Sequence, residues 1–196
     1  DELRAGLGLP PDAVLAGTAA VLNWRKAPDL FVETAARAIR SRPELPLHFA
    51  WLGLDPSTPE ARAMARDGQR AGIADRLHLV AASDRPEAWM RAFDVFVLSA
   101  REDAYPLACL EAAAAGRPIV CFDAGGMPEF VADDAGVVVD FPDVGAMAHA
   151  VAELGADHER RLRAGSVARA RVVERHDTSV AAPRWWDTVS RWVPQP

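Results

Sequence analysis

The chain has 196 residues, of which 50% are apolar and 26% are charged, and its formal net charge is −6. This length and composition fit one globular domain with a buried core and exclude a disordered chain. The negative net charge argues against general nucleic-acid binding. The cysteines, Cys109 and Cys121, lie inside apolar runs, which indicates small buried side chains rather than a disulfide framework or a metal site.

Residues 1–11 are polar and contain glycine and proline, so we expect a lead-in linker. The chain begins at Asp1 without a methionine, which suggests a domain boundary. No apolar run approaches the roughly 20 residues that span a bilayer, and no signal peptide is recognisable. These observations predict a cytoplasmic location.

Short apolar runs alternate with amphipathic segments along the rest of the chain. The apolar runs predict strands at residues 14–22, 47–52, 77–80, 95–98, 119–122 and 136–139. Apolar residues at helical spacing predict helices at residues 28–39, 59–71, 87–93, 106–115, 143–154 and 159–174, and a terminal helix at about residues 178–193. Helices of this length between strands indicate βαβ units.

The alternation predicts an α/β fold for residues 1–196 as a single domain: a Rossmann-like three-layer αβα arrangement with a mostly parallel sheet of about six strands, plus C-terminal helices. The near-continuous apolar strands fit a sheet that is covered on both faces. In such sheets ligands bind beyond the carboxyl ends of the strands. The loops that follow the strands are therefore the segments to inspect for function.

The loop after the first predicted strand contains Arg25 and Lys26, directly before the helix that begins at Pro28. Cationic side chains beside the free N–H groups of a helix N-terminus form an anion site, and a diphosphate is a natural ligand for it. The residues alone fit a solvated basic turn equally well.

The loop after residues 95–98 contains Asp103 and leads into a helix with one charged residue, Glu111. Asp103 could cap that helix, and Glu111 could lie on an exposed stripe of it. A carboxylate at position 111 could instead accept hydrogen bonds from the two hydroxyls of a ribose. The pair Gly125 and Gly126 follows the next strand, where it forms either an ordinary turn or a close backbone approach to a ligand.

The order and spacing of these motifs resemble a known enzyme family. The stretch SAREDAYPLACLEAAAAGRPIVCFDAGGMPEFV is similar to the signature of family 4 (group 1) glycosyltransferases, which have the GT-B fold. That signature places an acidic residue eight positions before a helical Glu, as Asp103 and Glu111 are placed, and continues into a Gly-Gly-x-Pro-Glu turn. The segment WRKAPDLFVETAARA resembles the basic loop of the family, and HFAWLG its second strand.

The resemblance implies a role for each matching position. Lys26, with Arg25, would contact the donor diphosphate, and Glu111 would bind the ribose hydroxyls. Asp103 would lie near the sugar and the reacting centre as the catalytic carboxylate. The other implied substrate-binding positions are Val80 near the nucleobase, and Tyr105, Pro106, Leu107, Gly125 and Gly126 around the sugar and phosphates.

Four positions depart from the family pattern. Asp103 is shorter than the usual Glu, Pro106 stands where Gly is common and provides no N–H donor, and Ala27 replaces the usual Gly after the lysine. The separate upstream Arg of the family is replaced by Val21, for which Arg25 could substitute.

The resemblance implies the donor-binding half of a retaining glycosyltransferase, which transfers a hexose from a UDP- or GDP-sugar to an acceptor. It implies no metal and no further cofactor, because basic residues and a helix N-terminus would stabilise the leaving diphosphate. The expected partners are the nucleotide sugar and an N-terminal acceptor-binding domain that these residues do not contain, and no nucleic acid. Peripheral membrane association would arise only through that domain. The alternatives are a catalytically degenerate nucleotide-binding module and, with less support, a nucleotide-sugar epimerase.

Two further groups of residues are interpreted structurally. The five histidines show no metal-ligand spacing, so we expect surface or core roles for them. Trp185, Trp186 and Trp192 are expected to be packing residues of the terminal helix, which in the GT-B fold crosses back to the other domain, although they could form a sugar platform.

Overall fold

The structure is a computed structural model that describes residues 2–132 and 134–192. Within these residues one sheet has the strand order β3-β2-β1-β4-β5-β6, and every pair of neighbours is parallel. Its strands are β1 (Val14–Ala19), β2 (Leu47–Leu54), β3 (Leu77–Ala81), β4 (Val95–Leu98), β5 (Ile119–Phe122) and β6 (Gly136–Val139). The strand order reverses between β1 and β4, which is the point where doubly wound sheets bind ligands.

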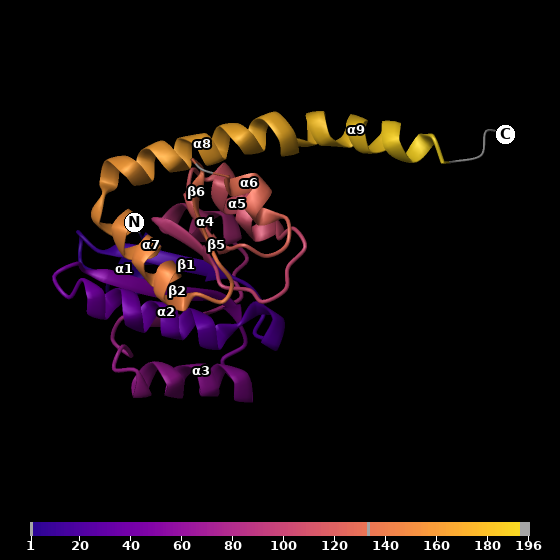
Figure 1. Cartoon of the computed structure of the whole chain (residues 1–196). Coiled ribbons are helices and arrows are strands. Elements are labelled where there is room, and N and C mark those ends of the chain that lie inside the picture. Colours follow the sequence, from indigo (N-terminus) through magenta and orange to yellow (C-terminus); the bar gives the residue numbers. More distant parts are fainter. Residues whose placement is uncertain (1, 133, 193–196) are drawn as a thin grey trace.

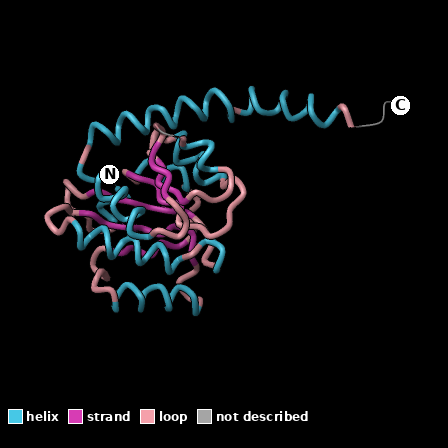
Figure 2. Tube along the Cα trace, in the orientation of Figure 1, coloured by secondary structure: helices cyan, strands magenta, loops and turns pink. Residues whose placement is uncertain are grey.

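Helices cover both faces of this sheet, so the predicted three-layer α/β fold is confirmed (Figures 1 and 2). The helices on one face are α2 (Pro28–Ser41), α3 (Pro59–Arg70) and α7 (Val144–Ala156). Those on the other face are α1 (Glu2–Gly6), α4 (Pro86–Ala92), α5 (Leu107–Ala114), α6 (Met127–Val131) and α8 (His158–His176). A short 3-10 helix, η1 (Trp24–Lys26), precedes α2, and α9 (Thr178–Ser190) follows α8.

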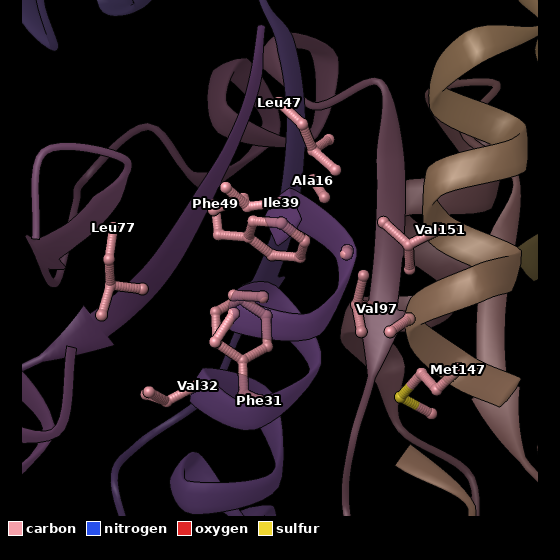
Figure 3. Close-up of a cluster of buried hydrophobic side chains, with 14 of the residues drawn as sticks. Ala16, Phe31, Val32, Ile39, Leu47, Phe49, Leu77, Val97, Met147 and Val151 are labelled. Atoms are coloured by element: carbon pink, nitrogen blue, oxygen red, sulfur yellow. The ribbon is translucent and has the colours of Figure 1, made fainter. Parts of the chain in front are cut away.

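The strands divide their side chains between two hydrophobic clusters, because successive residues of a strand point to opposite faces. On the α2 face, the rings of Phe31 and Phe49 pack edge to face with centroids 5.8 Å apart. Figure 3 shows these rings beside β4 and the side chains that α7 contributes. On the other face, Leu15 and Phe96 pack with the residues of α4 and α5. The central strands β1, β2, β4 and β5 are therefore buried on both faces, as their apolar runs predicted, whereas the edge strands β3 and β6 are partly exposed.

The two cysteines lie in the second cluster with no exposed surface. Burial raises the pKa of Cys109 well above its usual value and that of Cys121 to about 12. Both are free thiols, so the expectation of small buried side chains is confirmed.

The structure differs from the sequence expectations at the shortest elements. The expected lead-in linker contains α1, whose Arg4 donates hydrogen bonds to Asp94 Oδ2 at 2.9 Å and to Ala92 O at 2.8 Å. The segment after Gly126 forms α6 rather than a simple turn. Both helices have five residues, which is too short for an apolar period to be recognised.

The terminal helix α9 lies outside the packed layers. It continues beyond α8 and extends away from the sheet (Figure 1). None of its residues is buried, and Trp185, Trp186 and Trp192 are 63%, 60% and 85% exposed. Within the described part of the chain these tryptophans do not pack against the sheet layers. Packing against another domain, which the resemblance implies, stays a prediction. No helix of that part is both long and apolar enough to cross a membrane.

Candidate functional site

A cavity opens at the carboxyl ends of β1 and β4, where the strand order reverses. Its volume is about 250 Å³. The residues that line it are Thr18, Ala19, Ala20, Lys26, Phe96, Leu98, Ser99, Ala100, Pro106, Leu107 and Ala108. Apart from the strand residues, the lining comes from the loops after β1 and β4 and from the first turn of α5. We refer to this space as the switch-point cavity.

Lys26 is the cation of the switch-point cavity. Its backbone N–H donates to Asn23 Oδ1 at 3.0 Å, so the Asn23 side chain caps η1 and fixes the loop. The Lys26 ammonium forms an ion pair with the carboxylate of Asp103, and the two side chains are only 25% and 14% exposed. The two residues that were predicted to bind donor phosphates and sugar therefore meet directly.

Ala27 connects η1 to α2 in a left-handed conformation, with φ 53° and ψ 60°. The residue is fully buried, and Ser99 Oγ donates to its carbonyl oxygen at 3.4 Å. A side chain with a Cβ disfavours this conformation by roughly 1–2 kcal/mol per residue. Glycine adopts this backbone conformation without strain. This explains why the family usually has Gly at the position that Ala27 occupies here.

Replacing Ala27 by glycine is expected to raise the free energy of unfolding by about 0.5 kcal/mol, because relief of the left-handed strain exceeds the entropy that glycine adds to the unfolded chain. Chemical denaturation measures this change. Ala170→Gly in the middle of α8 is the control, and it should lower stability by about 1 kcal/mol. Equal losses in both variants would contradict the strain at Ala27.

Arg101 joins the loop after β4 to the loop after β1. Its guanidinium donates to both carboxylate oxygens of Asp29, at 2.8 and 2.6 Å, and to Trp24 O at 3.1 Å. It also lies 5.3 Å from the centroid of the Trp24 ring. The hydrogen bond from Arg101 lowers the pKa of Asp29 below its usual value. Sequence analysis missed this residue, because nothing in its local pattern indicates a partner 72 positions away.

Arg25, in contrast, does not line the switch-point cavity. Its Nε lies 3.7 Å from Glu102 Oε2, and both side chains are more than 60% exposed. A surface pair of this kind contributes little stability. Its carbonyl oxygen accepts a hydrogen bond from Arg101 N at 2.8 Å, so the backbone of Arg25 helps to join the two loops.

The N-terminus of α5 forms another wall of the cavity. Pro106 occupies the N-cap position, and no side chain caps the helix. The first N–H groups of an α-helix have no partner within the helix, so those of Leu107 and Ala108 remain available to a ligand. Leu107 is 72% exposed. The positive end of α5 and Lys26 therefore line the same space, which favours an anion there.

Glu111 lies one turn further along α5 and lines a second, larger cavity of about 600 Å³. The other lining residues are Pro86, Glu87, Met90, Arg91, Ala114, Ala115, Arg117 and Arg169. We refer to this space as the α4–α5 cavity. Glu111 is exposed, so the structure agrees with the interpretation that it lies on an exposed helix stripe. That stripe nevertheless connects the two cavities, because Leu107 and Glu111 are four residues apart on one helix face.

The pair Gly125 and Gly126 packs against the loop that contains Asp103. Gly126 N donates to Ala104 O at 2.8 Å. A Cβ at Gly125 would lie 1.9 Å from Asp103 O, and one at Gly126 would lie 2.6 Å from the Tyr105 ring. The glycines thus permit a close approach between two loops of the site. Tyr105 is 37% exposed, and its hydroxyl oxygen lies 3.0 Å from Nε2 of His176.

Val80 lies on the edge strand β3, which β2 separates from β1 and the switch-point cavity. It lies within β3, where it pairs with Leu52 of β2 and packs on the second hydrophobic cluster. It lines neither the switch-point cavity nor the α4–α5 cavity. The structure therefore brings Lys26, Asp103, Pro106 and Leu107 together, whereas Val80 remains apart.

The histidines do not gather into a metal site. His48 and His78 lie on neighbouring strands with Nδ1 and Nε2 3.1 Å apart, and burial lowers the pKa of both. In residues 2–132 and 134–192, no group of three or more His, Cys, Asp or Glu side chains is arranged to hold a metal ion.

Known proteins share the sequence pattern and the fold of this chain. The family described as glycosyl transferases group 1 matches residues 11–157. The chain belongs to this family. One relative, the lipopolysaccharide core biosynthesis mannosyltransferase LpsB of Rhizobium meliloti, is 29% identical over 189 residues, which cover 92% of this chain and 54% of LpsB.

Solved structures share the fold of this chain. The Anabaena protein Alr3699/HepE, solved in complex with UDP-glucose, superimposes with a TM-score of 0.85 at 18% identity, over 97% of this chain and 52% of that chain. The C-terminal domain of the group 1 protein LpcC from Francisella tularensis superimposes with a TM-score of 0.73 at 20% identity, over 84% of this chain and 86% of that domain. The chain thus spans about half the length of LpsB and of Alr3699/HepE. It corresponds to the C-terminal domain of a group 1 glycosyltransferase.

Proposed function

We propose that this domain binds the nucleotide-sugar donor of a retaining glycosyltransferase, which transfers a hexose to an acceptor. The observation that carries the proposal is the switch-point cavity, where Lys26 and the uncapped N-terminus of α5 line one space. A diphosphate there would be neutralised by an ammonium group and by backbone N–H donors. The UDP-glucose bound by Alr3699/HepE supports a ligand of this class.

The donor would extend over α5 from one cavity to the other. Its diphosphate would occupy the switch-point cavity, and Glu111 would accept hydrogen bonds from the ribose hydroxyls at the mouth of the α4–α5 cavity. The base would then face the space between α4 and α5, which is lined by Arg91, Arg117 and Arg169. UDP and GDP are the first ligands to test.

The chemistry would depend on stabilisation of the leaving group. The bond between the anomeric carbon and the diphosphate oxygen breaks, a bond to an acceptor oxygen forms, and the acceptor proton is released. Negative charge that develops on the diphosphate would be stabilised by Lys26 and the α5 N–H groups in place of a metal ion. Asp103 contacts the Lys26 ammonium, so it would place this cation and lie next to the reacting centre.

Calorimetric titration of the chain with UDP, GDP and ADP tests the proposal. We expect one of them to bind, and we expect no sugar transfer by residues 1–196, because the acceptor-binding half lies outside these residues. A chain that binds none of the three would favour the catalytically degenerate module instead. Robust transfer by residues 1–196 would contradict the need for a second domain.

Replacing Lys26 by alanine should weaken binding of the nucleoside diphosphate by roughly 10- to 100-fold, since a charge-assisted hydrogen bond to phosphate is lost. Binding of the matching nucleoside should change little, because it has no phosphate. Arg40→Ala removes an exposed charge from α2 and is the control. Equal losses for diphosphate and nucleoside would contradict the placement of the phosphates.

A further inference from the structure

Tyr105 and His176 form a contact that the proposed function does not use. The Tyr105 hydroxyl oxygen lies 3.0 Å from His176 Nε2, and the two ring centroids are 5.4 Å apart. Burial raises the pKa of Tyr105 and lowers that of His176, so both side chains are neutral near pH 7. The neutral phenol can therefore donate its proton to the unprotonated Nε2.

On one side, this contact connects to the loop of the candidate site. Tyr105 lies between Asp103, which pairs with Lys26, and Pro106, which begins the wall of the switch-point cavity. The ring packs against Gly126, and the neighbouring Ala104 carbonyl accepts the Gly126 N–H. The position of the Tyr105 ring therefore determines where this loop rests.

On the other side, the contact connects to a helix that is firmly held. The His176 ring lies 5.7 Å from the ring of Phe130, which is 1% exposed. Five residues earlier in α8, Arg171 donates to Phe130 O at 2.5 Å, to Val131 O at 2.9 Å and to Asp134 Oδ1 at 2.5 Å. These hydrogen bonds join α8 to α6 near the end of the helix that carries His176.

His176 is also the last residue of α8. The next residue, Asp177, caps α9, the helix that has no buried residue and extends away from the sheet (Figure 1). His176 therefore lies at the boundary between the packed layers and α9. Its hydrogen bond to Tyr105 connects this boundary to the loop of the site.

We propose that His176 is a positioning residue of the candidate site: its hydrogen bond with Tyr105 holds residues 103–106 against the Gly125-Gly126 turn. The part of this proposal that concerns ligand affinity rests on the proposed function. The part that concerns the loop does not, so the two are tested separately.

Hydrogen exchange of the ligand-free chain tests the loop. His176→Leu should accelerate exchange in peptides that cover residues 99–107 and 123–128 by about fivefold, which corresponds to the loss of one net hydrogen bond. His176→Gln should restore the slower rate, because its amide oxygen can accept the Tyr105 proton. His149→Leu, at an exposed position of α7, is the matched control. Unchanged exchange in His176→Leu would overturn the proposal.

A double-mutant cycle separates this contact from a general loss of packing. In a Tyr105→Phe background the hydrogen bond is already absent, so His176→Leu should cause little further acceleration. Full additivity of the two changes, or a failure of His176→Gln to restore the rate, would contradict a hydrogen-bonded positioning role.

The last readout is nucleotide affinity. It is measured with the one of UDP, GDP and ADP that binds the wild-type chain most tightly. His176→Leu should weaken it by about fivefold and His176→Gln should retain it. If the exchange results hold but no nucleotide binds, the proposed function fails and the positioning of the loop stands. If the wild-type chain binds a nucleotide and neither readout responds to His176→Leu, the positioning role fails and the proposed function stands.

Discussion

Replacing Glu111 by alanine should weaken nucleoside diphosphate binding by at least about 30-fold, because a carboxylate that accepts two ribose hydroxyls contributes roughly 2 kcal/mol or more. The free energy of unfolding should remain within about 0.5 kcal/mol of the wild-type value. The reason is that Glu111 is exposed on α5 and forms no ion pair within the described residues. Calorimetry and chemical denaturation measure the two quantities on the same variant.

Glu87 is the matched control for this experiment, since it is a second carboxylate at the α4–α5 cavity but comes from the opposite helix. Glu87→Ala should preserve most of the affinity if the ribose lies against α5. The affinities of the 2′-deoxy and ribo forms of the nucleotide should also be compared. Glu111→Ala should reduce the difference between these two affinities, because the variant lacks the carboxylate that accepts the 2′-hydroxyl. Unchanged affinity in Glu111→Ala would contradict the ribose contact, and a variant that unfolds would show that the carboxylate is structural.

Much of the fold follows from local pattern. The strands β4, β5 and β6 have the bounds that their apolar runs predict, and most helices begin or end within two residues of the expected positions. A parallel sheet covered on both faces requires such runs, which makes the signal strong. The order of the strands could not be derived in this way, because the pairing of β1 with β4 joins segments about 80 residues apart.

The candidate site was predicted only as a set of loops. The loops that carry Lys26 and Asp103 both follow strands and were therefore expected at the same edge of the sheet. The structure shows that the two side chains are in contact. The residues that organise these loops were missed. Arg101 and His176 act through partners that lie 72 and 71 positions away, and neither belongs to a local motif. Single-sequence reasoning contains no information on such pairs, since they arise from packing.

The tryptophans of the terminal helix show why exposure on one domain does not decide a packing role. Large aromatic side chains at helical spacing usually pack against a core, and this led to the expectation for Trp185, Trp186 and Trp192. Because α9 extends beyond the layers, these three rings have no described neighbour on the sheet. Their packing against the other domain, to which the terminal helix of the GT-B fold crosses back, stays a prediction.

The second large effect is expected at Gly125. Gly125→Ala should lower the free energy of unfolding by about 3 kcal/mol, through left-handed strain and through a clash that separates two loops. The glycine has φ +68°, and an added Cβ would lie 1.9 Å from Asp103 O. A backbone atom cannot yield in the way that a flexible side chain can, so residues 103–105 must shift.

Gly8 separates the two contributions, since it has the same φ of +68° and an added Cβ there would meet no atom within 4 Å. Gly8→Ala should therefore cost only about 1 kcal/mol, which is the strain of the backbone conformation alone. The difference between the variants measures the contact between the Gly125 turn and the loop of Asp103. Because that loop supplies Asp103 and Pro106, nucleotide affinity should fall in Gly125→Ala and remain in Gly8→Ala. Equal destabilisation in both would mean that the loops do not depend on this contact, and the close approach would then have no role in shaping the site.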